Sequence, residues 1–385
     1  MNAVAGAAAV ARVRPAAAAR TRLLQVVLSL SPGGTEHLVV EMCRRLPPEF
    51  EVSVCCLDEE GAWAAELRRA GVEVTALRRG PGIRPVLGWR IAQLAAQRNI
   101  DLLHCHQYSP FVYGRLAMLR NRRLQMVYTE HGRLSDAPPS WKRRLANPVL
   151  SRFDGAIVAV SDELRRYMFD ARFPLGGVSV IHNGIDPQRL PTADDRVCAR
   201  RRLELGDGDI VAMTVARLDP VKDLITLLDA FAIVRRCVPA ARLVVVGDGP
   251  ERARLAERSA RPDLAGAVRV VGFRSDVRQL LAAADLYVCS SISEGISITI
   301  LEAMAAGLPI VATRVGGTPE ILSAGCGVLV PGRNSHELAA AVGALAVDER
   351  RRAALGAAAR RRLESAFTID RMVDDYSRLY RRVLS

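Results

Sequence analysis

Short apolar runs alternate along this chain with longer segments in which apolar residues recur at helical spacing. The runs predict buried strands, and the segments between them predict amphipathic helices. Regular alternation of strands and helices is typical of parallel sheets with helices on both faces, so we predict a doubly wound α/β fold. The predicted strands are residues 23–30, 51–57, 72–77, 102–103, 125–129, 155–160, 178–181, 210–215, 243–246, 268–271, 285–289, 310–313 and 328–330.

A polar, proline-bearing run that ends near Asp195 interrupts this alternation and predicts a linker between two domains. A chain of 385 residues is long enough for two domains. Residues 1–20 are rich in Ala and Arg, and we expect a disordered tail there, although a transit peptide would have a similar composition. No apolar stretch of about 18 residues occurs, so the sequence predicts no membrane-spanning helix.

The eight cysteines are scattered, and no Cys-x2-Cys pair is matched by a second pair, which disfavours a zinc site. This usage indicates a reducing, cytosolic compartment. The net charge is +13, with most of the excess in the first half of the chain. Such an excess suits nucleic acid, an anionic substrate or an anionic membrane, and an arginine-rich proteome would also produce it. Nucleic acid is disfavoured because the chain lacks aromatic stacking sites beside a basic reading element.

Residues 138–152 form a basic amphipathic pattern that contains Trp141, Lys142 and Leu145. The pattern fits a helix lying on an anionic membrane surface, and it equally fits an ordinary solvated helix face.

Two acidic residues frame the stretch that follows the predicted strand 285–289. Glu294 lies in a short polar turn, and Glu302 lies in a helical pattern that Gly307 and Pro309 end. Eight residues of helix span about 12 Å, farther than the roughly 5 to 9.5 Å between glycosidase carboxylates. We therefore favour two carboxylates that bind hydroxyl groups on two parts of one long ligand. The alternative is a turn acid plus a solvated helix acid.

Two cations flank another predicted turn before a helix, Arg217 and Lys222. Cations beside a helix N-terminus suit a diphosphate and would stabilise its charge as it leaves, whereas a surface salt bridge is the plainer interpretation. Gly33 and Gly34 follow the first predicted strand, where backbone N–H groups can face an anion. The turn at Glu294 has the same features, because Gly295 admits a ligand to the backbone and Ser297 is a candidate N-cap.

Histidines follow two predicted strands, at the sheet edge where such folds bind ligands. His104 and His106 follow residues 102–103, and His131 follows residues 125–129. We interpret His104 as a structural histidine and His131 as a candidate site residue. No third ligand at workable spacing indicates a metal site.

The pattern Glu294-x7-Glu302, within Ser-Glu-Gly-Ile-Ser-Ile-Thr-Ile-Leu-Glu-Ala-Met-Ala-Ala-Gly-Leu-Pro, resembles the signature of the retaining GT-B glycosyltransferases of family 4. The wider run looks most like the sugar transferases of bacterial exopolysaccharide gene clusters. The resemblance implies two Rossmann-like doubly wound domains facing a cleft. The implied parts are the tail 1–20, an acceptor-side domain 21–187, a nucleotide-sugar domain 188–366 and a C-terminal helix 367–385 that packs back on the first domain.

The resemblance also implies roles for individual residues. Arg217 and Lys222 would hold the diphosphate, Glu302 the ribose hydroxyls and Glu294 the donor sugar. Two positions depart from the family pattern, because Ala216 and Asp223 stand where glycine is usual. His131 would lie at the reacting face of the donor sugar and His106 on the acceptor side. The other donor-binding residues would be Gly33, Gly34, Gly272, Phe273, Arg274, Gly295, Ile296 and Ser297, with Gly272 to Arg274 against the nucleobase.

We therefore predict a retaining, metal-independent hexosyltransferase that needs no cofactor. It would move a sugar from a nucleotide diphosphate sugar to a glycan or lipid-linked acceptor in polysaccharide biosynthesis. We expect it in the cytoplasm, with an anionic membrane surface as a further possible partner of its basic first domain. Alternatives are a nucleotide-sugar-binding module without turnover, a basic nucleic-acid-binding protein, and a GT-B epimerase or phosphorylase. The last lacks a recognisable lysine motif for a pyridoxal cofactor.

Overall fold

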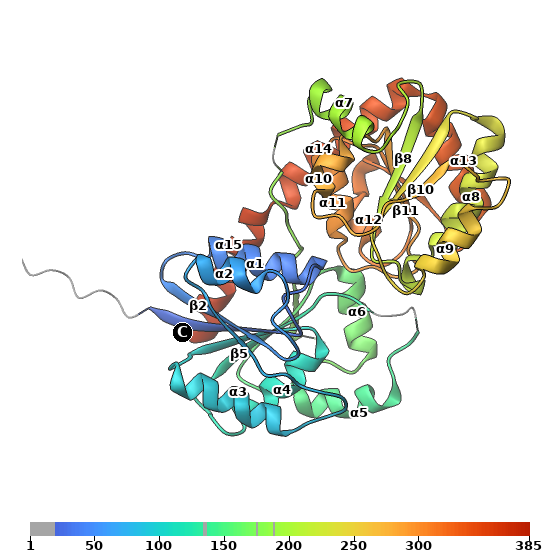
Figure 1. Cartoon of the computed structure of the whole chain (residues 1–385). Coiled ribbons are helices and arrows are strands. Elements are labelled where there is room, and N and C mark those ends of the chain that lie inside the picture. Colours follow the sequence, from blue (N-terminus) through green and yellow to red (C-terminus); the bar gives the residue numbers. More distant parts are fainter. Residues whose placement is uncertain (1–19, 134–136, 175, 188) are drawn as a thin grey trace, which may run out of the picture.

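The computed structural model describes residues 20–133, 137–174, 176–187 and 189–385. The predicted tail 1–20 lies outside the described residues except for Arg20. Two parallel sheets, each covered by helices, make two domains (Figure 1), so the predicted doubly wound α/β fold is confirmed.

The first sheet has seven parallel strands in the order β3-β2-β1-β4-β5-β6-β7. The order reverses between β1 and β4, which is where doubly wound sheets bind ligands at their carboxyl edge. β4 continues to His106, beyond the predicted end at residue 103, so both histidines of this segment are strand residues. The bounds are β1 Thr21–Val27, β2 Phe50–Cys56, β3 Glu73–Ala76, β4 Leu102–His106, β5 Gln125–Glu130, β6 Gly155–Ala159 and β7 Val178–Val180.

Helices cover both faces of this sheet because neighbouring strand residues point to opposite sides. On β1, Leu23 and Val27 pack toward α1 and its neighbours, whereas Leu24 and Val26 pack toward α3 and α4. α5 lies at the outer end of the second layer (Figure 1). The bounds are α1 Gly34–Arg45, α2 Ala64–Arg69, α3 Val86–Gln97, α4 Tyr108–Met118, α5 Trp141–Leu150 and α6 Asp162–Asp170.

The second sheet repeats this plan with six parallel strands in the order β10-β9-β8-β11-β12-β13. One face packs on α8, α9 and α13, and the other on α7, α10, α11 and α14. The strands are β8 Ile210–Val215, β9 Ala241–Val246, β10 Val268–Val270, β11 Leu286–Cys289, β12 Ile310–Thr313 and β13 Val328–Val330. The helices are α7 Ala193–Arg202, η1 Pro220–Lys222, α8 Leu224–Cys237, α9 Arg252–Ser259, α10 Val277–Leu281, α11 Ile298–Ala305, α12 Thr318–Ile321, η2 Ser323–Gly325, α13 Ser335–Val347 and α14 Glu349–Ala366.

The last helix, α15 Ile369–Leu384, leaves the second domain and packs on the first (Figure 1). Its buried face meets Leu38, Met42 and Phe50 of the first domain. Each large apolar side chain buried in this way stabilises the contact by about 1.5–3 kcal/mol. α15 therefore connects the second domain to the first through a buried apolar contact.

The chain crosses between the domains twice, and the two crossings lie side by side. Ile185 donates its backbone N–H to Phe367 at 2.9 Å and accepts one from Ile369 at 2.9 Å. A Cβ at Gly184 would lie 2.1 Å from the carbonyl oxygen of Thr368, so only glycine allows this approach. The two crossings are thus joined by backbone hydrogen bonds.

Candidate active site

The predicted site residues lie on loops that follow strands of the two sheets, or on helices that these loops begin. The turn after β11 inserts between the domains, because a Cβ at Gly295 would lie 2.1 Å from the carbonyl oxygen of His131. On the other side of the turn, a Cβ at Gly316 would lie 1.9 Å from the carbonyl oxygen of Glu294. Asn183 donates its side-chain amide to the carbonyl of Ile296 at 3.0 Å. Gly295 and Ile296 therefore belong to the interface between the domains.

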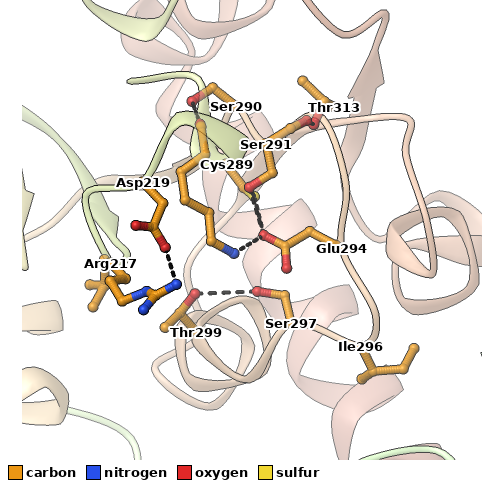
Figure 2. Close-up of polar contacts among 12 residues, drawn as sticks. Arg217, Asp219, Cys289, Ser290, Ser291, Glu294, Ile296, Ser297, Thr299 and Thr313 are labelled. Carbon is orange, nitrogen blue, oxygen red and sulfur yellow. Dashed lines mark hydrogen bonds and ion pairs between the residues drawn. The ribbon is translucent and has the colours of Figure 1, made fainter. Parts of the chain in front are cut away.

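Glu294 is the acceptor at the centre of this turn (Figure 2). Its Oε1 atom accepts from Lys222 Nζ at 2.6 Å and from Ser291 Oγ at 2.6 Å. The Glu294 side chain is 9% exposed and that of Lys222 is 23% exposed. Burial disfavours a charged lysine, but the Glu294 carboxylate outweighs it and raises the pKa of Lys222 above its ordinary value. Lys222 thus carries its charge at neutral pH.

Backbone contacts hold Lys222 in place at the end of η1. Ser290 donates its hydroxyl to the Lys222 carbonyl at 2.8 Å, and Ile292 donates its N–H to Val221 at 2.9 Å. The next residue, Asp223, has a φ of 46°, in the left-handed region that favours glycine. This conformation explains physically why glycine is usual at that position in the resembling family.

Arg217 follows β8, and its side chain is 69% exposed and paired with Asp219 (Figure 2). In the facing domain, burial raises the pKa of Glu36 in the first turn of α1, and Arg217 acts in the opposite direction. Arg217 therefore presents its charge to the space between the domains.

Glu302 lies in the second turn of α11, and its side chain is 15% exposed. Burial raises the pKa of Glu302 to about 7, and Arg278, whose Nε lies 3.9 Å from Oε1, only partly opposes the rise. The carboxylate therefore has capacity for hydrogen bonds from a ligand, which the ionised form accepts better. Sequence reasoning missed Arg278, because nothing in its local pattern distinguishes it.

The two glycine loops take different positions. Gly33 is the N-cap residue of α1, and a Cβ at Gly34 would lie 3.3 Å from Cγ1 of Ile298. The N-termini of α1 and α11 therefore meet across the interface, and both favour an anion between them.

The loop predicted to lie against the nucleobase follows β10. Gly272 has a φ of 75° and is followed by the exposed ring of Phe273. Arg274 forms a bidentate ion pair with Asp276, in which Nε and Nη2 each donate to a carboxylate oxygen at 2.8 Å.

Ser297 occupies the N-cap position of α11, but its hydroxyl does not cap the helix. Its Oγ lies 3.3 Å from Oγ1 of Thr299 instead (Figure 2). The predicted side-chain cap is therefore wrong. The physical reason is that the Ser297 hydroxyl is directed to Thr299, whose Oγ1 lies 2.8 Å from Tyr287 Oη.

His131 follows β5 and borders the Glu294 turn through its backbone. Its Nε2 lies 2.9 Å from His106 Nδ1, and His106 Nε2 lies 2.7 Å from Gln25 Oε1. His106 is 1% exposed, so any influence it has on a ligand must pass through His131. His104 has both ring nitrogens bonded, at 2.6 Å to Tyr380 and 2.8 Å to Thr129, as expected of a structural histidine. Sequence reasoning also missed Gln25, whose only signal is an amide inside an apolar strand.

Within the described ranges, no three His, Cys, Asp or Glu side chains gather in a way that could hold a metal ion. In the same ranges, no helix has the length and apolar character needed to cross a membrane.

Comparisons with known proteins agree with this geometry. The model of the family described as "Glycosyl transferases group 1" matches residues 196–362, and that of "Glycosyltransferase Family 4" matches residues 32–189. The chain is 31% identical over 296 residues to the GDP-mannose-dependent alpha-(1-6)-phosphatidylinositol monomannoside mannosyltransferase of Mycolicibacterium smegmatis, covering 72% of this chain and 75% of the relative. It is 29% identical over 290 residues to EpsD of Bacillus subtilis, whose assignment as a glycosyltransferase is provisional, covering 72% and 76%.

Among solved structures, Anabaena Alr3699/HepE in complex with UDP-glucose matches with a TM-score of 0.85 and 25% identity, covering 94% of this chain and 100% of that one. The chain belongs to the group 1, family 4 glycosyltransferases of the GT-B fold. It is a glycosyltransferase that uses nucleotide sugars, so the predicted family and enzyme class are confirmed. The roles assigned above to single residues stay predictions.

Proposed function

We propose that this enzyme transfers a hexose from a nucleoside diphosphate sugar to a hydroxyl of a glycan or lipid-linked acceptor, with retention at the anomeric carbon. The observation that carries the proposal is the cluster at the Glu294 turn. Lys222 lies 2.6 Å from Glu294 there, and Arg217, which follows the same strand β8, pairs with Asp219 and acts on Glu36 of the facing domain (Figure 2). Glu302 lies on the helix that the same turn begins. Cations, a helix N-terminus and two carboxylates match the charges and hydroxyls of such a donor.

In the proposed reaction, the bond from the anomeric carbon to the β-phosphate oxygen breaks, and a bond to the acceptor oxygen forms. The acceptor hydroxyl gives its proton to the departing diphosphate. Glu294 is a poor nucleophile or base because its ion pair with Lys222 at 2.6 Å lowers the basicity of the carboxylate. Attack on the face that the diphosphate leaves therefore fits better than inversion or a covalent intermediate. Arg217 and Lys222 would stabilise the charge that develops on the diphosphate.

We also propose that these two cations do the work that a divalent metal does in other sugar transferases. The proposal is supported by the contact of Lys222 with the turn that precedes α11 and by the effect of Arg217 on the pKa of Glu36 in the facing domain.

A donor screen followed by a stereochemical assay tests this function. Thermal shifts with UDP-, GDP-, ADP- and dTDP-sugars would identify the donor. Early proton NMR spectra of the sugar released by slow donor hydrolysis would then give its anomeric form, with and without EDTA. We expect the anomeric configuration of the donor and an unchanged rate in EDTA. An inverted product would overturn retention, loss of rate in EDTA would overturn metal independence, and binding without turnover would overturn catalysis by these residues.

We further propose that the acceptor is part of polysaccharide biosynthesis and that the enzyme works in the cytoplasm. The resemblance of residues 290–309 to sugar transferases of exopolysaccharide gene clusters supports a role in exopolysaccharide assembly, although the Mycolicibacterium relative is named for a phosphatidylinositol monomannoside. Eight free cysteines, five of them buried, support a reducing compartment.

The exposed surface of α5 supports the proposal that the enzyme acts at a membrane. α5 exposes Trp141, Leu145 and Val149, at 68%, 68% and 64% of their surface. Spaced by four residues, they form one stripe on the helix. Asn147 lies on the opposite side, is fully buried, and donates to the carbonyl of Ala171 at 2.8 Å.

The stripe therefore faces solvent, because the buried Asn147 anchors the opposite side of α5 to the domain. Exposed cations flank it on the same helix, Lys142 and Arg144. The end of the neighbouring α4 adds the exposed residues Leu119 and Arg120. An apolar stripe between cations is complementary to an anionic lipid surface. We propose that the enzyme binds such a surface through this face.

A further inference from the structure

A chain of three polar side chains runs from the interior of the first sheet to His131. Gln25 lies on β1, His106 ends β4, and His131 follows β5. β4 lies between the other two strands in the sheet, so the three side chains form a row across neighbouring strands. Gln25 Oε1 lies 2.7 Å from His106 Nε2, and His106 Nδ1 lies 2.9 Å from His131 Nε2.

The partners along this row fix the direction of each hydrogen bond. An amide oxygen can only accept, so His106 must donate from Nε2 to Gln25. Burial, with the neighbouring His104 and His131, lowers the pKa of His106 well below the ordinary value, so the ring is neutral and its Nδ1 carries no proton. His106 Nδ1 must therefore accept, and His131 must donate from Nε2.

Nδ1 of His131 is then unprotonated. Burial lowers the pKa of His131 to about 3, so this ring is also neutral and its Nδ1 has a free lone pair. Nδ1 is buried and has no hydrogen-bond partner among the described residues. Buried polar atoms in folded proteins are normally paired. The backbone carbonyl of His131 touches the Glu294 turn at Gly295, so this unpaired nitrogen belongs to a residue that borders the candidate donor site.

His104 packs against His106 and restricts the movement of its ring. The ring of His104 lies 3.9 Å from that of His106, centre to centre. His104 is itself fixed by Tyr380 of α15 and by Thr129, which also lies 3.1 Å from Tyr376 of α15. His106 therefore has little freedom to turn over and reverse its two bonds.

We propose that Gln25 and His106 are positioning residues that hold His131 in its Nε2–H tautomer, so that Nδ1 accepts a hydrogen bond from a sugar hydroxyl. The identity of that hydroxyl as part of the sugar rests on the proposed function, whereas the tautomer does not. A hydroxyl that donates to His131 leaves its own oxygen as an acceptor for another group. The site would therefore discriminate against sugars that lack a hydroxyl, or carry an ether, at this position.

Nitrogen NMR of the full chain labelled with 15N-histidine tests the tautomer without any ligand. Six histidines give a tractable spectrum, and His131→Asn identifies the signals of His131. We expect a protonated Nε2 and an unprotonated Nδ1 at His131. A protonated Nδ1 in the wild-type chain would overturn the proposal outright.

Variants of Gln25 test the positioning role. Gln25→Met keeps the approximate volume but removes the acceptor, so His131 should lose its single tautomer and kcat should fall about tenfold, as expected for one hydrogen bond. Ser53→Ala is the matched control, because Ser53 is a buried polar residue on the neighbouring β2 outside this row.

The affinity readout separates this proposal from the proposed function. With the donor selected by the thermal-shift screen, Gln25→Met should weaken binding of the nucleotide sugar but leave binding of the matching nucleoside diphosphate unchanged. An unchanged His131 tautomer in Gln25→Met, or equal losses for both ligands, would overturn the positioning role. If no nucleotide sugar binds the wild-type chain, the proposed function fails while the tautomer result stands.

Discussion

Lys222 and Glu294 are joined by a contact of 2.6 Å although 72 positions separate them in the sequence. The contact links the turn after β8 to the turn after β11, and these strands are neighbours in the second sheet. Adjacent parallel strands bring their carboxyl ends together, so the fold itself forms the pair. The Glu294 carboxylate raises the pKa of Lys222, and the contact orients both side chains between the two turns.

Breaking this pair should impair both folding and catalysis. Lys222→Met or Glu294→Gln alone should lower the free energy of unfolding by about 2–3 kcal/mol, somewhat less than for a fully buried pair. Each should also lower kcat by about 10²–10³-fold, as for other groups that stabilise transition-state charge. Urea unfolding and initial-rate kinetics measure the two effects.

The double variant completes the test. It should recover part of the lost stability, because no unpaired charge remains, but none of the activity. Arg254→Ala, which breaks an exposed ion pair with Glu251, should change neither. Additive losses of stability in the double variant would contradict the coupling.

Glu302 should make stability and donor binding depend on pH in opposite ways. Its pKa of about 7 lies above the ordinary 4.5, so between these pH values the folded chain holds a proton that the unfolded chain has released. Stability therefore falls as the pH rises through this window, by on the order of 3 kcal/mol, and stays lower above it. Donor affinity should instead rise toward pH 8, because the ionised carboxylate accepts hydroxyls better.

Glu302→Gln separates these two effects. The variant should have a higher Tm than wild type at pH 8 and a similar Tm near pH 4.5, while its donor Kd should be weaker at every pH. Calorimetric titrations in buffers of different ionisation enthalpy should show proton release when wild type binds the donor at pH 6.5, and none for Glu302→Gln. A Tm difference that does not change with pH would rule out the assigned pKa.

Glu320 is a contact between the domains that should stabilise their closed arrangement. It accepts from the backbone N–H groups of Asp162 and Glu163 at 3.0 Å each and lies 3.1 Å from His182 Nε2. Burial opposes its charge, but His182 and the two N–H groups lower its pKa below the ordinary value. Its contribution is therefore present above about pH 4.5 and lost as the pH falls through the lowered pKa.

Glu320→Ala should lower the free energy of unfolding by about 2 kcal/mol at pH 7. It should also raise the radius of gyration in solution X-ray scattering, because the first turn of α6 loses its partner in the other domain. Glu337→Ala, at the first turn of α13 within the second domain, is the control and should leave the radius unchanged. An unchanged radius in Glu320→Ala would show that other contacts set the domain arrangement.

The α5 surface should bind vesicles that contain anionic lipid. Sedimentation with phosphatidylglycerol vesicles should retain the wild-type chain, and pure phosphatidylcholine vesicles should not, because both the stripe and the cations contribute. Trp141→Ser with Leu145→Ser should reduce binding about tenfold or more. Val347→Ser removes a similarly exposed apolar residue from the second domain and should bind as wild type does. Equal retention of the double variant would place lipid binding elsewhere.

The sequence by itself determined the strand and helix alternation, the two doubly wound domains and the family, because these depend on local periodicity and on one long motif. It also identified Glu294, Glu302, Arg217 and Lys222 as chemically suited to a nucleotide sugar. Periodicity within one segment carries no information about which segments meet, so the partners of these residues could not be read from it.

Only the tertiary structure decided that Lys222 pairs with Glu294, that Gln25 is hydrogen-bonded to His106, and that Glu320 caps a helix of the other domain. It also decided that Ser297 does not cap α11 and that His106 is buried within its strand. These outcomes depend on the order of strands in each sheet and on the approach of two domains. Hydrogen bonds and ion pairs form between groups that are close in space, and the fold sets that closeness across many intervening residues.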